Sequence, residues 1–300
     1  IKELKLDNGF CSEEIMDNYS DPKFTTSEGI THLLDRIYTM FPSKKYSMTV
    51  GCHGTGWVPA GTFNTRAGSL RSDDIPETRY LGGTTIDFQI EISTFKKGIT
   101  DSKIGKFEMI LFDNCYMSNV EVAYELKDVC KYIVAYPTEV MAYGFPYSTS
   151  GKYMINGIDF EQICESFYTF YSRYERPCGT IATINCSGLD TLARFMKKVN
   201  QSVDTTVHVD SLQRYDGYDP IIFVDFQDYV CHLTDNPQFI SELDDLMSVV
   251  IPFKKNTPTY YSTLGGQIPI AKYSGISISE PSEHPVMQSY KQTSWYKATH

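Results

Sequence analysis

Apolar and polar residues follow two different periods along this chain. Short runs rich in β-branched residues, about six residues long, are typical of strands buried in a parallel sheet. They cover residues 46–52, 106–112, 132–136 and 179–186. Longer segments with apolar residues at helical spacing predict amphipathic helices over residues 31–41, 88–99, 118–128, 160–174 and 189–199. Because strands and helices alternate, we predict an α/β fold in which helices cover both faces of a mostly parallel sheet.

The pattern changes near residue 250, where segments rich in Tyr, Ser and Gly replace the clear alternation. A strand-like stretch returns at 273–279, and nothing before Lys23 has the pattern of an apolar strand. We therefore expect a main domain over residues 1–250. A C-terminal extension over residues 251–300 would pack on this domain or complete it.

Composition and charge exclude several classes of protein. Of 300 residues, 41% are hydrophobic, which is enough for a large core and argues against a disordered chain. The net charge of −10, with no basic run, makes nucleic acid a poor partner. No run of about 18 apolar residues is present, so we expect no membrane span. The chain begins at Ile1 without an export signal, which indicates a mature or truncated fragment.

Eight cysteines are spread through the chain without a Cys-x-x-Cys pair, which argues against a disulfide scaffold or a zinc ribbon. They are Cys11, Cys52, Cys115, Cys130, Cys164, Cys178, Cys186 and Cys231. For most of them we expect a buried thiol that packs as a small hydrophobic side chain. A bridge between Cys178 and Cys186 stays open.

His53 and Cys115 come directly after two predicted strands. The crevice beyond the carboxyl ends of the strands is the usual functional site of an open α/β sheet. A thiolate is a nucleophile there, and a nearby imidazole can stabilise it and later protonate the leaving group. The alternative is a histidine and a cysteine that only pack in the core. Loop-forming or helix-starting residues follow both His53 and Cys115, which favours a reactive pair. The long Gly-rich and Ser-rich loop after His53 is typical of a functional segment.

Backbone groups beside this pair can stabilise an oxyanion. The N–H groups of Gly54 and Cys115 are the candidates. We expect the helix over 118–128, capped by Ser118 or Asn119, to begin close to the cysteine, so that its dipole favours the thiolate.

The same residues make a poor metal site. Neighbouring strand residues point to opposite faces, so Cys52 is expected in the core while His53 faces the crevice. With His53, Cys115 and Asp113 alone, a structural zinc ion lacks a fourth ligand. No EF-hand sequence is present.

These segments resemble the clostripain family of cysteine peptidases, within the caspase, gingipain and legumain superfamily. FPSKKYSMTVGCHGTGW is similar to the family's segment around its catalytic histidine, and ILFDNCYMSNVEVAYELKD to the segment around its nucleophile. PTEVMAYGFPY resembles the substrate-pocket loop, and SGISIS with SYKQTSWYKAT resembles the C-terminal end. The likeness covers residues 30–300.

The resemblance implies a caspase-like α/β/α sandwich and peptide-bond hydrolysis through a thioester. Cys115 would be the nucleophile and His53 the general acid and base. Cleavage would follow Arg or Lys, with Asp113 beside the pocket for the basic side chain and Glu139 and Tyr143 as further substrate-binding residues. Family members often carry another acidic residue near Tyr143, whereas this loop has none after Glu139.

The resemblance also implies an inactive precursor that is cut after a basic residue between the histidine and the cysteine. Arg66 is the candidate, followed by Lys96, Arg71 and Arg79; the alternative for Arg66 is an ordinary solvated arginine. No cofactor is required, and calcium remains open because some relatives depend on it. Family members are mostly exported bacterial proteins, so we expect a periplasmic, cell-surface or extracellular monomer that acts on polypeptides.

Two other hypotheses use the same scaffold. One is a catalytically idle module whose 22 tyrosines and polar loops bind a protein or a glycan. The intact His53 and Cys115 favour the peptidase. The other is acyl transfer or amidase chemistry by the same pair, which differs from hydrolysis only in the acceptor.

Overall fold

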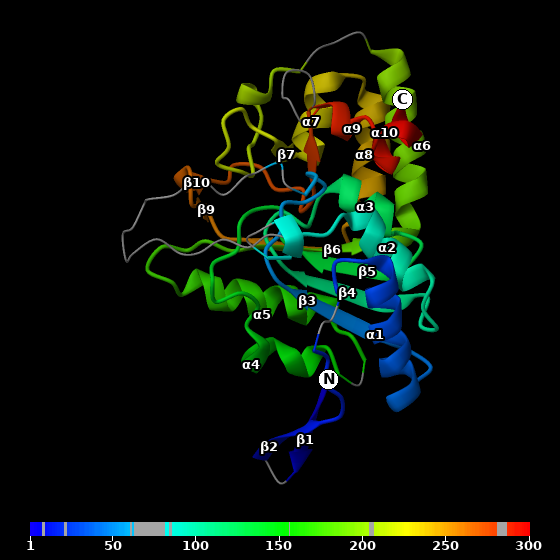
Figure 1. The fold of residues 1–300 in the computed structure, drawn as a ribbon. Coiled ribbons are helices and arrows are strands. Elements are labelled where there is room, and N and C mark those ends of the chain that lie inside the picture. The colour runs from blue at the N-terminus through cyan, green and yellow to red at the C-terminus, as the bar shows by residue number, and fades with distance from the viewer. Residues whose placement is uncertain are drawn as a thin grey trace.

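The structure is a computed structural model of the chain and describes residues 1–7, 10–20, 23–60, 62, 82–83, 86–155, 157–203, 207–280 and 287–300. A five-stranded sheet lies at its centre (Figure 1). In spatial order its strands are β3 (Ser47–Gly51), β4 (Phe107–Asp113), β5 (Cys130–Ala135), β6 (Thr180–Asn185) and β8 (Phe253–Asn256). β3, β4 and β5 pair in parallel, whereas β6 pairs antiparallel with both β5 and β8.

All four strands predicted from the sequence are in this sheet. Four of its five strands point the same way and β6 opposes them, so two of the four pairings are antiparallel. The sheet is therefore mixed. Most strands run in the same direction, as expected for a mostly parallel sheet, but not every neighbouring pair is parallel.

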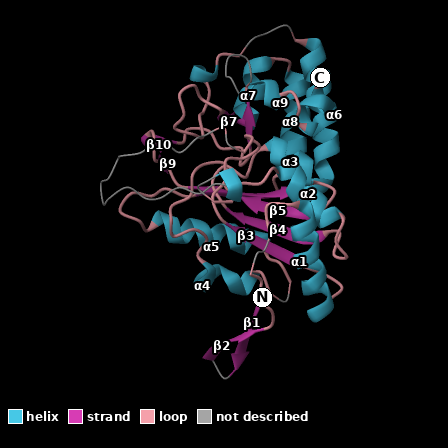
Figure 2. Ribbon diagram, viewed as in Figure 1, coloured by secondary structure: helices cyan, strands magenta, loops and turns pink. Residues whose placement is uncertain are grey.

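Helices cover both faces of the sheet, as Figure 2 shows. The longer helices are α1 (Ser27–Met40), α2 (Ile92–Thr100), α3 (Val120–Leu126), α5 (Phe160–Ser172), α6 (Leu189–Ser202), α7 (Phe226–Leu233) and α8 (Pro237–Val250). The short ones are α4 (Tyr147–Ser150), α9 (Met287–Tyr290) and α10 (Ser294–Thr299), with 3₁₀ turns η1 (Ile86–Phe88), η2 (Gly151–Tyr153), η3 (Cys186–Gly188) and η4 (Val209–Ser211). α5 and α4 lie on one side, and α1, α2, α3 and α6 lie on the other (Figure 2). This is the predicted sandwich.

The core is densest around β4, which lies between β3 and β5. Residues Met109, Ile110, Leu111 and Phe112 are fully buried because helices cover both sides of the strand. A continuous apolar run is the sequence pattern of such a strand. The carboxyl end of β4 is thereby fixed in place where Asp113 and Cys115 follow.

Local sequence sets the ends of the helices. Asn119 caps α3 through its side chain, which accepts a hydrogen bond from the Val122 N–H at 2.9 Å, as the sequence predicts. Thr26 caps α1 in the same way. The helix expected over 88–99 begins later, at Ile92, because Glu91 is extended and serves as its N-cap.

The C-terminal part of the chain shares the central core. β8 is the edge strand of the sheet, and α10 packs on α3 and α6. β9 (Thr259–Ser262) and β10 (Gly266–Pro269) form a hairpin. The strand-like stretch at 273–279 yields β11 (Ser277–Ser279), which pairs with β7 (Phe223–Asp225) outside the central sheet.

An antiparallel hairpin that the sequence pattern did not predict precedes α1. It consists of β1 (Lys2–Asp7) and β2 (Phe10–Ile15), and it projects from the rest of the fold (Figure 1). The side chains of β2 are exposed, so these strands lack the apolar alternation by which a buried strand is recognised. Across the described ranges, no helix combines the length and apolarity needed to cross a membrane.

Candidate active site

The carboxyl ends of β3 and β4 lie side by side. In the parallel register Gly51 is opposite Asp113. His53 follows the first of these by two positions, and Cys115 follows the second by two. Neighbouring strands are about 4.8 Å apart, so the two chains leave the sheet together and bring this histidine and cysteine to the same edge.

Gly54 brings the two strand ends into backbone contact. A Cβ on this residue would lie 2.4 Å from the Cys115 carbonyl oxygen and 2.9 Å from the Asn114 Cβ. Side chains do not approach this closely, so only glycine fits without displacing the backbone of the cysteine.

Asn114 joins the same two turns by hydrogen bonds. Its Nδ2 donates to the Cys52 carbonyl at 2.8 Å and lies 3.2 Å from the His53 carbonyl. The His53 N–H in turn donates to the Gly82 carbonyl at 3.3 Å. The backbone that carries the imidazole is thus held from both sides.

The residue after the cysteine has a strained backbone. Tyr116 has a φ of +59°, a left-handed conformation that a bulky residue adopts only when its surroundings enforce it. Its N–H donates to the Thr138 carbonyl at 3.1 Å, and its ring stacks on Phe223 with 5.2 Å between centroids. The Tyr116 hydroxyl donates to Glu139 at 2.6 Å. These contacts hold a sharp turn directly after Cys115.

This turn separates Cys115 from the next helix. α3 begins at Val120, five positions after Cys115, with the predicted Asn119 cap. The left-handed Tyr116 and the extended Asn119 cap occupy the chain in between. Because the field of a helix end acts within about one turn, the dipole of this short helix is a weak source of thiolate stabilisation.

The thiol of Cys115 lies beneath the loop that follows β5. The Val140 N–H donates to Sγ at 3.4 Å, and Sγ lies 3.8 Å from the Val140 carbonyl. Cys115 has 0% of its surface exposed. The sulfur is therefore covered in this conformation of the chain.

Asp113 lies under the same loop, further along. Its carboxylate accepts hydrogen bonds from the Phe145 N–H at 2.9 Å and the Tyr147 hydroxyl at 3.1 Å. Gly144, with a φ of +62°, passes so close that a Cβ would lie 2.6 Å from Oδ2. The predicted pocket residue is therefore buried and enclosed by residues 144–147.

Glu139 and Tyr143 occupy different surroundings. Glu139 is buried, and it accepts hydrogen bonds from the hydroxyl of Ser262 at 2.5 Å and from the Thr263 N–H at 3.0 Å, besides Tyr116. It connects the turn after the nucleophile with the β9–β10 turn. Tyr143 is 72% exposed on the surface of the same loop.

The cysteines are more varied than expected. Cys11 and Cys231 are exposed rather than buried. Cys52 is half-buried, and its sulfur lies 2.9 Å from the Asn114 Nδ2 instead of facing only the core. None of the eight cysteines forms a disulfide. The Cys178–Cys186 bridge that the sequence leaves open is not formed, and the Cys186 sulfur instead lies 3.7 Å from the Cys130 sulfur.

Comparison with known proteins fits this geometry. The family profile described as the clostripain family (Peptidase_C11) matches residues 4–277. The chain belongs to the clostripain family. It is a cysteine peptidase, a hydrolase with the caspase-like fold of that family. No curated protein matches the chain.

Three solved structures of clostripain-type proteases resemble this family member. It is 44% identical to iotapain, a secreted C11 cysteine protease from Bacteroides thetaiotaomicron, covering 100% of this chain and 84% of that one, with a TM-score of 0.91. It is 45% identical to a clostripain from the same organism, solved in complex with the peptide inhibitor BTN-VLTK-AOMK, over 74% of this chain and 99% of that one, with a TM-score of 0.71. An inactive zymogen C11 protease from Parabacteroides distasonis is 29% identical over 100% of this chain and 83% of its own, with a TM-score of 0.81.

Among the basic residues considered for the activating cut, Arg66, Arg71 and Arg79 lie outside the described residues. Lys96 is within α2 and pairs with Glu125 at 3.4 Å. A lysine held in a helix is a poor protease site, because a protease binds its substrate as an extended strand. In the described ranges, no group of three or more His, Cys, Asp and Glu side chains is arranged to hold a metal ion.

Sequence reasoning missed two residues of this clostripain-type site. Asn114 and Tyr116 hold the turns on either side of Cys115, but neither carries a motif of its own. Their position next to motif residues was the only available signal.

Proposed function

We propose that this clostripain-family member is an endopeptidase in which Cys115 and His53 form the catalytic pair. The observation that supports this most directly is the β3–β4 register, with Gly54 packed against the Cys115 backbone. The Cys115 thiolate attacks the peptide carbonyl, and the N–H groups of Gly54 and Cys115 stabilise the oxyanion. His53 protonates the leaving amine, and a thioester remains. Water then hydrolyses the thioester while His53 accepts a proton, so that the reaction uses only groups of the chain and water.

Hydrolysis of short reporter peptides tests this assignment. Cys115→Ala and His53→Ala should each lower kcat/KM by more than about 1,000-fold, because removing one member of such a pair removes the nucleophile or its proton transfer. Cys130→Ala is the matched control and should retain activity, because this buried thiol lies at the amino-terminal end of β5, opposite the sheet edge that carries Cys115. Turnover that persists in Cys115→Ala rules out this nucleophile.

We further propose that the enzyme cleaves after Lys or Arg and that Asp113 binds the basic side chain. The clostripain relative was solved with a peptide inhibitor whose amino-acid sequence, VLTK, ends in lysine. A carboxylate in a buried position attracts a cation strongly. The Tyr147 hydroxyl, which now hydrogen-bonds the Asp113 carboxylate, would share it with the substrate or give way to it. Glu139, whose carboxylate is already engaged by neighbours, would support the pocket rather than touch the substrate.

Asp113→Asn tests the pocket, because asparagine keeps the shape and an oxygen acceptor for the Phe145 N–H but removes the charge. We expect kcat/KM for Lys and Arg reporters to fall about 100-fold or more, since the desolvated cation of the substrate loses the carboxylate that pairs with it. If the wild-type enzyme prefers Gln to Lys at the residue before the cleaved bond, that result would contradict basic specificity.

We also propose that the chain is activated by a cut after Arg66, carried out by the enzyme itself. Support comes from the covered thiol of Cys115 and from the 29% identical relative described as an inactive zymogen. Arg66→Ala should stay uncut and inactive on incubation, and Cys115→Ala should also stay uncut. The same two fragments from purified Cys115→Ala would point to an outside protease. The relative described as secreted supports export of this chain and action on polypeptides outside the cytoplasm. We propose in addition that the enzyme acts as a monomer.

A further inference from the structure

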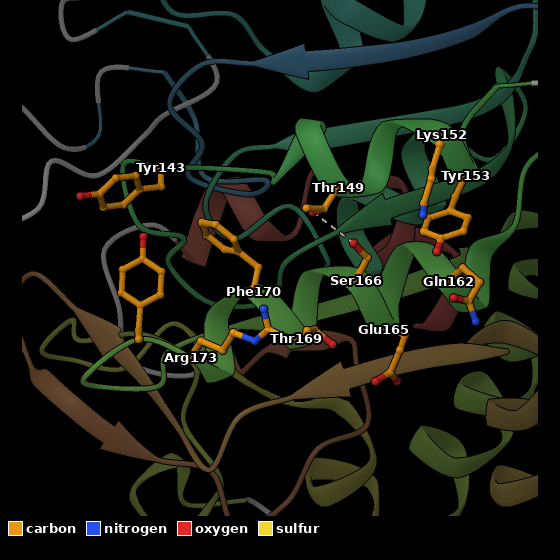
Figure 3. Close-up of a pocket in the computed structure, with 11 residues that line it drawn as sticks. Tyr143, Thr149, Lys152, Tyr153, Gln162, Glu165, Ser166, Thr169, Phe170 and Arg173 are labelled. Carbon is orange, nitrogen blue, oxygen red and sulfur yellow. Dashed lines mark hydrogen bonds between the residues drawn. The ribbon is translucent and has the colours of Figure 1, made fainter.

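A groove lies along α5 (Figure 3). It has a volume of about 860 Å³ and lies between α5 and the segment that contains α4 and η2. Tyr143, Phe170 and Arg173 surround one end, and Lys152 is at the other (Figure 3). A cleft of this size accommodates several residues of an extended peptide.

One short segment separates this groove from Asp113. Tyr143 and Thr149, at the ends of the segment, line the groove. Gly144, between them, contacts the Asp113 carboxylate, as does the Tyr147 hydroxyl. Since successive Cα atoms are about 3.8 Å apart, the groove begins one residue away from the backbone that touches the proposed pocket.

α5 fixes the position of this shared wall. The Tyr171 hydroxyl donates to the Gly144 carbonyl at 2.7 Å. Tyr174 meets the Tyr143 ring edge-on, with 5.6 Å between centroids. The groove and the pocket around Asp113 are thus two sides of one braced element.

The groove combines aromatic rings with cations that lack acidic partners. In the described part of the molecule, no ion pair engages Lys152 or Arg173, although the protein has a net charge of −10. The one carboxylate that lines the groove, Glu165, is paired with Lys255 at 2.7 Å. Arg173 is at the same end of the groove as Phe170 and Tyr143, and Lys152 is at the other end. This lining is complementary to a peptide segment that carries acidic side chains and an aromatic one.

We propose that this groove binds the stretch of the polypeptide substrate that flanks the cleaved basic residue, and that it selects acidic and aromatic side chains there. The inference rests on the proposed function, because it places the cleaved residue at Asp113. Lys152 and Arg173 each bind an acidic side chain, one at either end of the groove, and Phe170 and Tyr143 pack against the aromatic one. The enzyme would therefore recognise a substrate by two features of opposite charge, a base at the cleaved bond and an acid nearby.

Peptide binding to the Cys115→Ala protein tests the groove without requiring catalysis. Fluorescence anisotropy compares a peptide in which one lysine is flanked by two Asp and one Phe with a peptide in which Gln replaces both Asp and Ala replaces Phe. We expect about 10-fold tighter binding of the acidic peptide at low salt, as two partly exposed ion pairs allow. Adding Lys152→Gln and Arg173→Gln should remove this preference. The matched control, Lys44→Gln with Arg194→Gln, changes the net charge equally outside the groove and should keep it.

The same peptides then serve as substrates of the active enzyme. The double variant Lys152→Gln, Arg173→Gln should lose the preference in kcat/KM and still cleave a short lysine reporter at the wild-type rate. Acidic residues placed before and after the lysine are tested separately, so that either orientation is detected. Equal binding of acidic and neutral peptides in both orientations, or a preference that survives the double substitution, overturns the proposal. If the acidic peptide binds more tightly but the enzyme with Cys115 intact hydrolyses no peptide, before or after incubation, the groove is supported and the proposed function is refuted.

Discussion

Two residues with opposite properties hold the ends of β3 and β4 together. Gly54 permits backbone contact because it has no side chain, and Asn114 adds hydrogen bonds to the Cys52 and His53 carbonyls. The relative position of the imidazole and the thiol is therefore set by backbone packing. A shift of about 1 Å in such a site can reduce the rate about 100-fold.

Gly54→Ala should accordingly lower kcat/KM by about 100-fold, since its Cβ would displace the Cys115 backbone. Gly51→Ala is the matched control, because a Cβ there meets nothing within 4 Å. Reporter hydrolysis and the urea midpoint are measured for both variants. Near-normal activity of Gly54→Ala would show that the backbone contact does not position the cysteine.

Glu121 contributes a pH dependence of stability. It is 1% exposed on α3, where its Oε1 accepts a hydrogen bond from the Ser279 N–H at 3.0 Å. Burial raises the pKa of Glu121 to about 7. Between pH 4.5 and 7 the folded state then binds more protons than the unfolded state, so stability falls as pH rises through this window.

Glu121→Gln should remove this fall. We expect its free energy of unfolding to decline by about 3 kcal/mol less than that of the wild type between pH 4.5 and 8, as the shift in pKa implies. Urea unfolding at both pH values measures the difference. A Gln variant with the wild-type pH profile would show that this carboxyl ionises in the fold as it does in water.

Among the elements, α5 organises the proposed specificity loop. Its buried Tyr171 donates to the Gly144 carbonyl, which lies next to Asp113. Tyr171→Phe leaves that buried carbonyl without its donor, which costs about 1–3 kcal/mol of stability. We expect KM for a lysine reporter to rise about 5-fold with kcat within about 2-fold, because the loop positions the substrate rather than the reacting atoms.

Tyr168→Phe is the control on the same helix. No hydrogen bond of the Tyr168 hydroxyl is found among the described residues, and Lys255 lies 5.8 Å from its ring centroid. This variant should have wild-type KM. Equal effects of Tyr171→Phe and Tyr168→Phe would indicate that α5 acts on the site only through general stability.

The sequence could predict the elements whose signal is local. The apolar run of β4 marks a buried strand, and Asn119 marks the start of α3 through its own side chain. The hairpin before α1 escaped prediction because its side chains are exposed and carry no buried periodicity. Its Lys2–Glu13 and Lys5–Glu14 pairs are visible only once the register is known.

The details of the site depend on contacts far apart in the chain. The left-handed Tyr116 stacks on Phe223, and Glu139 reaches Ser262, which is 123 positions away. No local pattern encodes such contacts, and a left-handed tyrosine is unfavourable on its own. The position of His53 and Cys115 at neighbouring strand ends was therefore predictable from the sequence. The strained turn after Cys115 and the burial of its thiol were not.

At the scale of the whole molecule, the net charge of −10 would favour the approach of the basic substrates proposed above, and Lys152 and Arg173 in the α5 groove form a local exception to it. Cys115 is fully buried, whereas Cys11 and Cys231 are exposed and provide internal references for thiol reactivity.

Covalent labelling by a peptide acyloxymethyl ketone that ends in lysine tests the central claim most directly. The protein is labelled as purified and again after incubation that allows self-cleavage, and the modified cysteine is identified by peptide mass spectrometry. We predict a single label on Cys115, increased after cleavage and lost in His53→Ala, while Cys11 and Cys231 stay unmodified. Labelling of another thiol, equal labelling of Cys115 in His53→Ala, or no label on Cys115 in either preparation would contradict a catalytic pair of Cys115 and His53.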